Sequence, residues 1–393
     1  MKTTRRILQL AFLVLTLVGV FGVQGNAEAW CPFGGIEALY GYVKEGNLLC
    51  SLGISNFYIL AALLVVTLLV RRAFCGYLCP IGTVSEWLQR GAARLGLRAR
   101  TVPYKLDRGL ALLKYAVLAV ILFFTYRTAE LVFRGFDPCY ALLSRHGEDI
   151  TVWAYVVAGA IVVASLLIVM PFCRWLCPLA AVFHPFSRFG LARIKRDETM
   201  CIGCGKCATA CLMAIPVDRL RQVTAARCLS CFDCLEACPT QPQGAITWGP
   251  PGPSARRWPP AVIVAVILLS VTAAVAATYA FPLPSFVASR QLAPGEPAPA
   301  ETRTVEFQIE NLTCRGKATL LMWFLERDDE FTVPGRLKLE AWPGPGAARA
   351  RIIYDPTHAD DPAIRDAISE PCYDRVENRW RASPFVISQP GPG

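Results

Sequence analysis

Long apolar runs alternate along the chain with loops that are rich in arginine and proline. A helix needs about 20 predominantly apolar residues to cross the hydrocarbon core of a bilayer. Segments that approach this length occupy five positions: 7–23, 48–70, 110–126, 152–172 and 261–281. The pattern therefore predicts an α-helical membrane protein with five spans.

Basic residues are distributed unevenly among the loops between these segments. Residues 71–108 carry eight Lys and Arg and residues 171–258 carry eleven, whereas 24–55 carry one and 127–149 carry three. Lys and Arg accumulate on the cytoplasmic side of membrane proteins. The N-terminus and the two basic loops are therefore predicted to be cytoplasmic. The C-terminal region is predicted to lie outside the bacterial inner membrane, in the periplasm.

The first apolar run allows two interpretations. A basic start, an apolar run and Ala-Glu-Ala before Trp30 are features of a cleavable signal peptide. An internal repeat favours retention, because residues 5–90 and 108–188 share one order of features. Each has an outward apolar segment, a cysteine beside proline, an inward segment and a Phe-Cys-x-x-x-Cys-Pro motif. This order predicts two parallel repeats related by an axis along the membrane normal.

Composition supports the membrane assignment and adds an unusual cysteine content. Of 393 residues 54% are hydrophobic, which is too apolar for a soluble protein of this length. There are 17 cysteines but only three histidines. A chain this long does not need so many disulfides to fold, so the cysteines point to ligation chemistry. The net charge of +10 is accounted for by the cytoplasmic loops and implies no nucleic acid partner.

Two cysteine runs, "CIGCGKCATAC" from Cys201 and "CLSCFDCLEACP" from Cys228, share the spacing C-x2-C-x2-C-x3-C. Three cysteines at this spacing can place their thiolates on one face of a cubane, and the fourth must come from elsewhere. Structural zinc is the alternative, although it needs only two cysteine pairs. Residues 198–248 resemble bacterial ferredoxins with two [4Fe–4S] clusters, departing from them at Leu212, where proline is usual.

The resemblance implies that each run supplies the fourth ligand of the other cluster. The implied ligands of one cluster are Cys201, Cys204, Cys207 and Cys238, and those of the other are Cys228, Cys231, Cys234 and Cys211.

Two shorter motifs stand where apolar segments meet cytoplasmic loops: Cys75-Gly-Tyr-Leu-Cys79-Pro and Cys173-Arg-Trp-Leu-Cys177-Pro. On a helix, residues i and i+4 lie on one face, so each motif presents two sulfurs together. If the repeats are related by symmetry, the four thiolates converge and form the ligand set of a further Fe–S cluster. The alternative is that these are buried thiols that pack as small apolar groups.

The combination of these motifs over residues 50–250 resembles membrane-bound polyferredoxins of three systems: periplasmic nitrate reductase, nitrous oxide reductase maturation and cytochrome oxidase copper assembly. The resemblance implies electron transfer across or at the membrane.

Three further cysteines, Cys31, Cys50 and Cys139, are predicted on or near the periplasmic face. In an oxidising compartment three cysteines allow one disulfide and leave one thiol over. Cys31 and Cys139 occupy matched positions in the two repeats and are the preferred pair. Such a disulfide would be either a structural link or a redox-active group.

The region 302–390 predicts the element order β-α-β-β-α-β, an α+β ferredoxin-like domain. Together with the sequence "NLTCRGK" it resembles the heavy-metal-associated domain. That family binds metal through C-x-x-C, but here Cys314 is followed by Lys317 at the second cysteine position. Cys372 could either complete a metal or redox site or close a disulfide with Cys314.

These predictions divide the chain into a membrane domain (1–190), a cytoplasmic ferredoxin domain (191–250), a linker region with the fifth span (251–301) and a periplasmic domain (302–393). The three histidines, His146, His184 and His358, are predicted in loops and supply no axial pair for an intramembrane haem.

The leading functional hypothesis is a membrane-bound iron–sulfur electron-transfer protein. Electrons would come from a cytoplasmic donor such as an acidic flavodoxin or ferredoxin, which suits the basic loops. They would pass to a membrane or periplasmic acceptor, with a quinone or copper among the candidates. The alternatives are a copper-handling or other metal-handling accessory, and a redox sensor that uses the periplasmic domain.

Overall fold

The computed structural model divides the chain into two compact units, one of Met1–Gly35 with Ser55–Tyr279 and one of Ile36–Ile54 with Ala280–Gly393. Each is described by itself. The structure describes residues 2–22, 31–45, 55–97, 100, 102–128, 135–138, 151–240, 244–253, 256–290, 299, 301–327, 329–344, 348–374 and 379–390.

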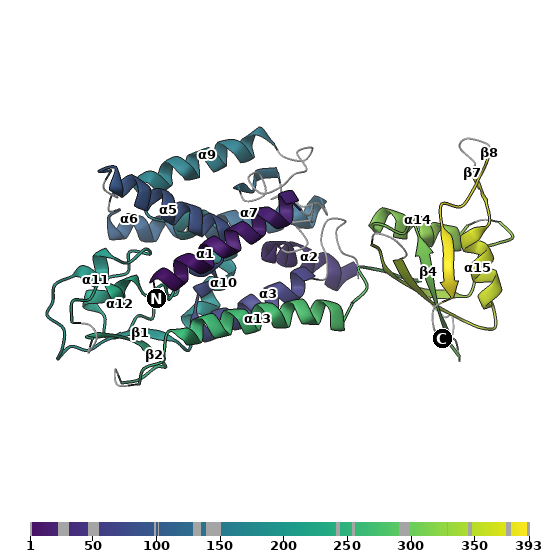
Figure 1. Ribbon diagram of the computed structural model, residues 1–393. Helices are drawn as coiled ribbons and strands as arrows, with labels where there is room; N and C mark the ends of the chain where they lie inside the picture. The colour runs from purple at the N-terminus through teal and green to yellow at the C-terminus, as the bar shows by residue number, and fades with distance from the viewer. Residues whose placement is uncertain are drawn as a thin grey trace. The chain divides into compact units, whose positions relative to one another are not determined.

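Apolar helices form most of the first unit (Figure 1). Within the described residues, three are long and apolar enough to cross a membrane: Thr3–Phe21, Lys105–Arg127 and Ala261–Ala280. They comprise α1 (Lys2–Leu17) with η1 (Val18–Gly22), α6 (Tyr104–Leu110) with α7 (Leu113–Thr128), and α13 (Ala261–Ala280). Two shorter apolar helices, α3 (Ser55–Val70) and α9 (Val152–Leu167), have 16 residues each. A further helix, α2, covers Pro32–Glu45.

The fourth predicted span extends too far. It was expected to reach residue 172, but α9 ends at Leu167, because Ile168 is extended (φ −132°, ψ 136°). Met170 then has a positive φ of 48°, which a helix does not tolerate. The chain restarts after this break in the single turn η5 (Phe172–Leu176).

The two Cys-x-x-x-Cys-Pro motifs have the same backbone geometry. In each, a one-turn helix, α4 (Ala73–Tyr77) or η5, precedes a longer helix, α5 (Pro80–Arg94) or α10 (Pro178–Arg188). The second cysteine is the N-cap of that longer helix, with φ −62° and ψ 119° at Cys79 and φ −62° and ψ 116° at Cys177. Proline occupies the first helical turn in both, where its missing N–H costs nothing.

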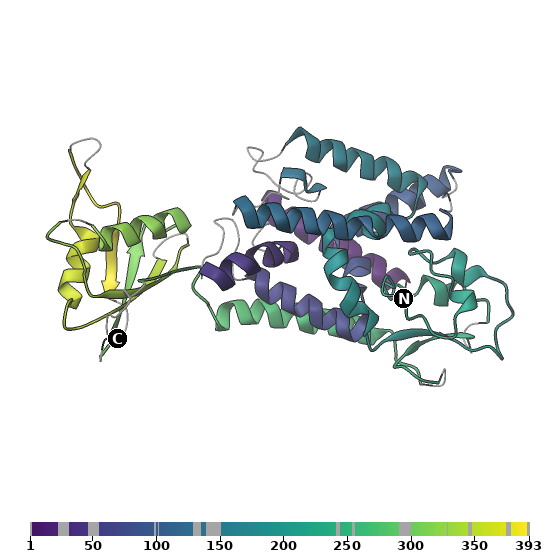
Figure 2. The same ribbon diagram turned by 180° about the vertical axis from the view of Figure 1, so that it is seen from behind.

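The two cysteine runs fold between two paired strands, β1 (Arg193–Arg196) and β2 (Ile246–Gly249), which are antiparallel. Short helices follow within this segment: α11 (Lys206–Thr209), η6 (Val217–Arg219) and α12 (Asp233–Glu236). This segment lies beside the end of α1 that carries the N-terminus (Figures 1 and 2).

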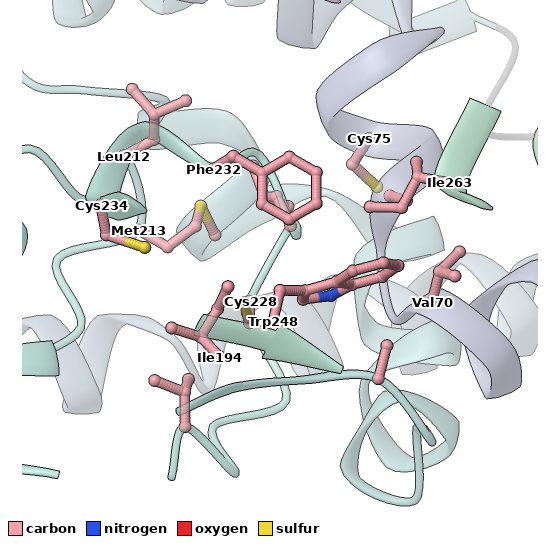
Figure 3. Packing of buried hydrophobic residues seen from close by; sticks show 14 of the residues in the cluster. Val70, Cys75, Ile194, Leu212, Met213, Cys228, Phe232, Cys234, Trp248 and Ile263 are labelled. Atoms are coloured by element: carbon pink, nitrogen blue, oxygen red, sulfur yellow. The ribbon is translucent and has the colours of Figure 1, made fainter. Parts of the chain in front are cut away.

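The ferredoxin segment shares one apolar core with the helices. Trp248 of β2 is 2% exposed and contacts Phe232 edge-on, with ring centroids 5.3 Å apart. The same core contains Val70 of α3 and Ile263 of α13 (Figure 3). The ferredoxin segment is therefore packed against the helices and not joined to them only by linkers.

The second unit is an α+β domain with the element order predicted for its C-terminal part. Its main elements are β4 (Arg303–Glu310), α14 (Arg315–Leu325), β5 (Arg336–Trp342), β6 (Ala348–Tyr354), α15 (Asp361–Ser369) and β9 (Val386–Pro390). Two features were not predicted: an edge strand β3 (Phe286–Ser289), and a hairpin of β7 (Cys372–Asp374) with β8 (Arg379–Arg381). The antiparallel sheet has the order β3-β5-β6-β4-β9, and both helices bury apolar residues against it.

Candidate metal centres

Three cysteines of the second run and one cysteine of the first run surround a single cavity. Its thiols come from Cys211, Cys228, Cys231 and Cys234, the set that the ferredoxin resemblance implies. The rest of the lining is almost entirely apolar: Ile194, Met213, Ile215, Val217, Val223, Leu229, Ser230 and Phe232. A group held here is shielded from water, and we call this cavity the inner site.

A second cavity gathers the other implied ligand set, Cys201, Cys204, Cys207 and Cys238. It differs from the inner site in exposure, because Cys204 is exposed whereas both Cys228 and Cys234 are buried. The Cys238 sulfur also lies 3.1 Å from the Thr240 hydroxyl. We call this cavity the outer site.

The backbone of the two runs repeats the same unusual conformations around these cavities. Gly203 and Ser230, at matched positions, have φ values of 69° and 50°. Gly205 and Phe232, again matched, have φ values of 66° and 64°. Left-handed conformations cost little for glycine but strain a phenylalanine, so the fold around Phe232 must impose this turn. Such turns let backbone N–H groups face the sulfurs, as the N–H of Gly203 does to Cys201. Ile215 N–H likewise donates to Cys211 Sγ at 3.4 Å.

The thiols differ in their acidity without a bound metal. Burial raises the pKa of Cys211 to about 11. The pKa of Cys201 is instead lowered, first by the N–H of Gly203 and then by the side chain of Arg196. Since the ligating form is the thiolate, loading the inner site must release protons.

The geometry suits a cluster better than a single ion. Structural zinc needs four ligands about 2.0–2.3 Å from one atom. Among the described residues, no three His, Cys, Asp or Glu side chains are grouped tightly enough to hold a metal ion. Four thiols that surround a common cavity fit a larger group that brings its own sulfides, which is a cubane.

The four cysteines of the boundary motifs interact with one another, and three of them interact with Arg72. Cys173 interacts electrostatically with Cys79, Cys177 and Cys75. Arg72 interacts electrostatically with Cys75, Cys177 and Cys173, and its Nη2 lies 3.9 Å from the Cys75 sulfur. We call this group the boundary site. Burial raises the pKa of both Cys79 and Cys177 to about 12.

Arg72 itself points to an anionic ligand at the boundary site. Its side chain is 1% exposed, and its Nε and Nη1 have no hydrogen-bond partner among the described residues. A buried guanidinium with donors left over is costly unless a negative group accompanies it. Thiolates carrying an Fe–S cluster would be such a group.

The boundary site and the inner site are neighbours. Tyr77, between Cys75 and Cys79, donates a hydrogen bond from its hydroxyl to the Ser230 carbonyl at 3.3 Å. A Cβ added at Gly76 would lie 3.3 Å from Cβ of Leu229, so α4 rests directly on the inner-site loop. Arg71 adds two hydrogen bonds, to the carbonyls of Ala192 at 2.7 Å and Ala225 at 3.0 Å.

A buried ion cluster joins the second boundary motif to the same loop. Asp107 of α6 accepts from Arg174, which follows Cys173, and from Arg227, which precedes Cys228. The indole of Trp175 donates to the same carboxylate at 2.9 Å. Asp107 is 2% exposed. Because it binds an arginine beside each site, it fixes the boundary site and the inner site relative to each other.

Sequence reasoning missed several of these residues. Arg71 and Arg72 were assigned to a basic cytoplasmic loop, but both are buried. Arg5 and Glu86 were given no role, although Arg5 is 0% exposed. The loop assignment of His184 was wrong, because it lies inside α10 and its Nδ1 is 2.6 Å from the Tyr115 hydroxyl.

The other predicted cysteines lie away from these sites or outside the described residues. Cys31 lies at the start of α2, whereas Cys50 and Cys139 fall outside the described residues, so the Cys31–Cys139 pair stays a prediction. Cys314 is exposed at the N-cap of α14, and Cys372 is buried with the core of its domain. The disulfide and the metal or redox site for these two cysteines both stay predictions.

Cross-ligation between the runs can be tested with single variants. We expect Cys211→Ser and Cys234→Ser each to lose about four iron atoms per chain and to leave the same surviving cluster. Cys238→Ser and Cys207→Ser should each lose the outer-site cluster and retain the inner-site cluster. Electron paramagnetic resonance of the reduced proteins would show matching spectra within each pair. If the spectrum of Cys211→Ser matched that of Cys207→Ser instead, each run would hold its own cluster.

Comparison with known protein families identifies iron–sulfur domains in the chain. A 4Fe-4S binding domain matches residues 52–100 and 150–197, which contain the boundary motifs, and a 4Fe-4S dicluster domain matches residues 193–239. The iron–sulfur character predicted from the cysteine spacing is confirmed by these matches.

Individual relatives are of the electron-transport and ferredoxin type. The chain is 33% identical to YccM of Escherichia coli over 224 residues, 55% of this chain and 62% of that protein. It is 30% identical to the ferredoxin-type protein NapH of Haemophilus influenzae over 195 residues, 45% of this chain and 64% of that protein. It is 29% identical to NirI of Paracoccus denitrificans over 168 residues, 42% of this chain and 24% of that protein. These matches span less than two thirds of each relative, and no solved structure matches.

Proposed function

From this relationship to polyferredoxin-type electron transport proteins, we propose that the chain is a membrane-bound iron–sulfur protein that moves electrons from a cytoplasmic donor to an acceptor in the membrane or periplasm. The observation that carries the proposal is the succession of the three cysteine sites. The outer site is exposed at Cys204, the inner site is buried, and the boundary site packs directly on the inner-site loop at the ends of apolar helices.

The outer and inner sites would each hold one [4Fe–4S] cluster through the four cysteines that line them. Such a cluster supplies a one-electron redox couple whose potential depends on nearby charge, hydrogen bonds to sulfur and exposure. The chain fixes the order of the sites through Tyr77 and Asp107, which tie both boundary motifs to the inner-site loop.

A third cluster at the boundary site extends this path to the membrane. Its support is the convergence of Cys75, Cys79, Cys173 and Cys177, with the spare donors of Arg72 among them. The matched backbone at Cys79 and Cys177 also supports the two parallel repeats, since both motifs present their sulfurs from equivalent turns.

The location of these sites supports a cytoplasmic donor. The N-terminal Arg5, the boundary motifs and the ferredoxin segment contact one another at one end of the apolar helices. These are the segments whose basic residues predict a cytoplasmic location. A negatively charged flavodoxin or ferredoxin would be attracted to such a surface.

The structure offers space for a membrane acceptor next to the boundary site. A cavity of about 260 Å³ lies among α1, α5 and α9. Pro80, the residue after Cys79, is part of its lining. Its wall is apolar apart from Ser85 and Ser165, whose hydroxyls are 2.8 Å apart. An acceptor of the quinone class, with an apolar body and polar oxygens, fits this lining.

Inverted membrane vesicles test this function directly. We expect reduced flavodoxin added outside, at the cytoplasmic face, to reduce either a quinone in the bilayer or ferricyanide trapped inside. The rate should fall at least tenfold in Cys234→Ser, because the inner site loses a ligand, and should be unchanged in Cys314→Ser. Reduction of the quinone alone would place the acceptor in the membrane. Equal rates in vesicles without the protein would refute electron transfer.

A further inference from the structure

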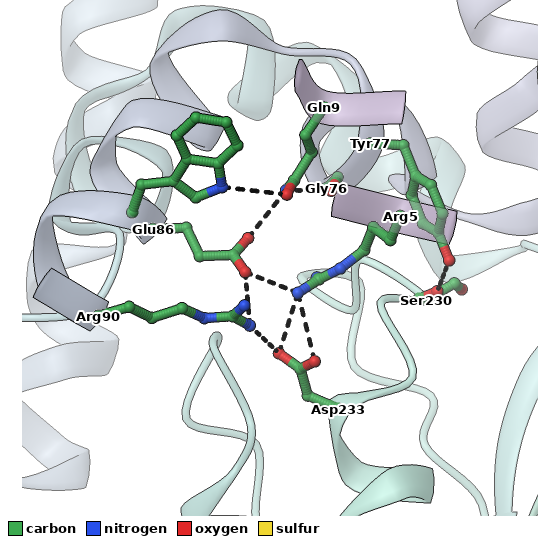
Figure 4. Close-up of polar contacts among 9 residues, drawn as sticks. Arg5, Gln9, Gly76, Tyr77, Glu86, Arg90, Ser230 and Asp233 are labelled. Atoms are coloured by element: carbon green, nitrogen blue, oxygen red, sulfur yellow. Dashed lines mark hydrogen bonds and ion pairs between the residues drawn. The ribbon is translucent and has the colours of Figure 1, made fainter. Parts of the chain in front are cut away.

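A buried arginine from the first membrane helix reaches into the ligand loop of the inner site (Figure 4). Arg5 of α1 is 0% exposed. Its Nη2 donates to Glu86 Oε1 at 2.6 Å and to both carboxylate oxygens of Asp233 at 3.2 Å. Asp233 lies between Cys231 and Cys234, two cysteines of the inner site.

Contacts of Gln9 fix the rotation of α1 about its axis, so that Arg5 faces inward. Gln9, one turn after Arg5, donates to the Gly76 carbonyl at 3.0 Å and to Glu86 Oε2 at 3.0 Å. The Trp87 indole donates to Gln9 Oε1 at 3.4 Å. Arg6, the neighbouring residue, is exposed and therefore faces away.

Arg5 belongs to a group of four charged side chains beside the inner site. Arg90, 23% exposed, completes a group of two cations and two carboxylates through Glu86 at 2.6 Å and Asp233 at 3.3 Å. Arg5 also interacts electrostatically with Cys231, and its Nε and Nη1 have no hydrogen-bond partner among the described residues. Arg71 adds a further cation beside Cys228.

The outer site has cations of its own. The side chain of Arg196, 14% exposed, hydrogen-bonds to Cys201, and Lys206, the residue matched to Asp233, is exposed. Charges at such a position are screened by water, whereas buried charges act with little screening.

We propose that Arg5 is a positioning residue that raises the reduction potential of the inner site. Reduction adds one negative charge to a cluster, and burial alone disfavours that charge. The positive charge of Arg5, which interacts electrostatically with Cys231, offsets part of this penalty, whereas the carboxylate of Asp233 acts in the opposite sense. One electron leaves the outer site and one is gained by the inner site, with no bond broken and no proton transferred.

This inference rests on the proposed function for its cluster assignment, and it requires that α1 stays in the mature protein. The interpretation of residues 7–23 as a cleaved signal peptide would remove Arg5, leaving Glu86 and Asp233 with Arg90 alone.

Redox titration of the full-length, anaerobically purified protein tests the role of Arg5. The midpoint potential of each cluster would be followed by electron paramagnetic resonance, with Cys207→Ser and Cys234→Ser used to identify the two signals. We expect Arg5→Gln to lower the inner potential and leave the outer one unchanged, Arg5→Lys to restore part of the shift, and Arg6→Gln to change neither. Asp233→Asn, which removes a negative charge, should raise the inner potential.

Other outcomes of the redox titration would contradict the role of Arg5. Equal shifts of both potentials in Arg5→Gln, or no shift in either Arg5→Gln or Asp233→Asn, would overturn the proposal, as would N-terminal sequencing that finds α1 absent. The titration needs only the assembled clusters. If the midpoint potentials shifted as predicted but no electrons flowed in the vesicles, only the proposed function would be refuted. If electrons flowed but the potentials did not shift, only the role of Arg5 would be refuted.

Discussion

Replacing Cys75, Cys79, Cys173 and Cys177 together by serine is expected to lower the iron content from about twelve to about eight atoms per chain. The four thiols converge at the boundary site, and each cubane accounts for about four irons. Iron and acid-labile sulfide would be measured on anaerobically purified protein. Cys314→Ser, which removes an exposed thiol in the other unit, is the matched control and should retain about twelve.

The role of Arg72 gives a second test of the boundary site. Arg72→Met keeps all four thiols but removes the buried cation among them. An anionic cluster would lose its charge partner, so we expect about eight irons in this variant also. About eight irons in the unaltered protein would contradict a third cluster and leave these cysteines as packed thiols.

Replacing Asp107 by alanine is expected to destabilise the protein by about 3–5 kcal/mol. The carboxylate is 2% exposed and holds Arg174 and Arg227, whose side chains are 5% and 18% exposed, so its loss leaves both cations without an anion. Thermal unfolding of the purified protein in detergent, followed by circular dichroism and by bleaching of cluster absorbance, would measure the effect. The inner site and the boundary site should both lose iron below the temperature at which unaltered protein does.

A surface ion pair provides the control for Asp107. Glu198 contacts Arg221 at 2.9 Å, and the side chains are 45% and 81% exposed. Exposed pairs contribute little, so Glu198→Ala should change stability by less than about 1 kcal/mol. If Asp107→Ala behaved like Glu198→Ala, the ion cluster would not be what fixes the two sites relative to each other.

The sequence predicted which cysteines line the two cavities, because the spacing within each run is local. In each run three cysteines and the left-handed turns at Gly205 and Phe232 lie within a few residues of one another, and the same spacing repeats. The order of strands and helices in the C-terminal domain also follows from local alternation of apolar residues. The strand β3 was missed because it has only four residues and pairs with β5, far along the chain.

The polar residues of the sites could not be predicted, because their burial depends on distant contacts. Arg5 and Asp233 are separated by 228 positions, and Arg227 and Asp107 by 120. In sequence, an arginine at the end of an apolar run looks the same whether water or another helix covers it. Arg72 was therefore assigned to a loop by the rule that predicts a cytoplasmic location from basic residues at this end of the helices.

The core that the ferredoxin segment shares with the helices can form only late in the synthesis of the chain. Trp248 packs against Trp258, with ring centroids 5.5 Å apart, and in the same core as Ile263 of α13. Both partners leave the ribosome after the last cysteine ligand, Cys238, has been made. One side of the ferredoxin segment therefore stays open until α13 has been inserted into the bilayer. All eight cysteines of the two runs are therefore synthesised before the core that packs against them is complete.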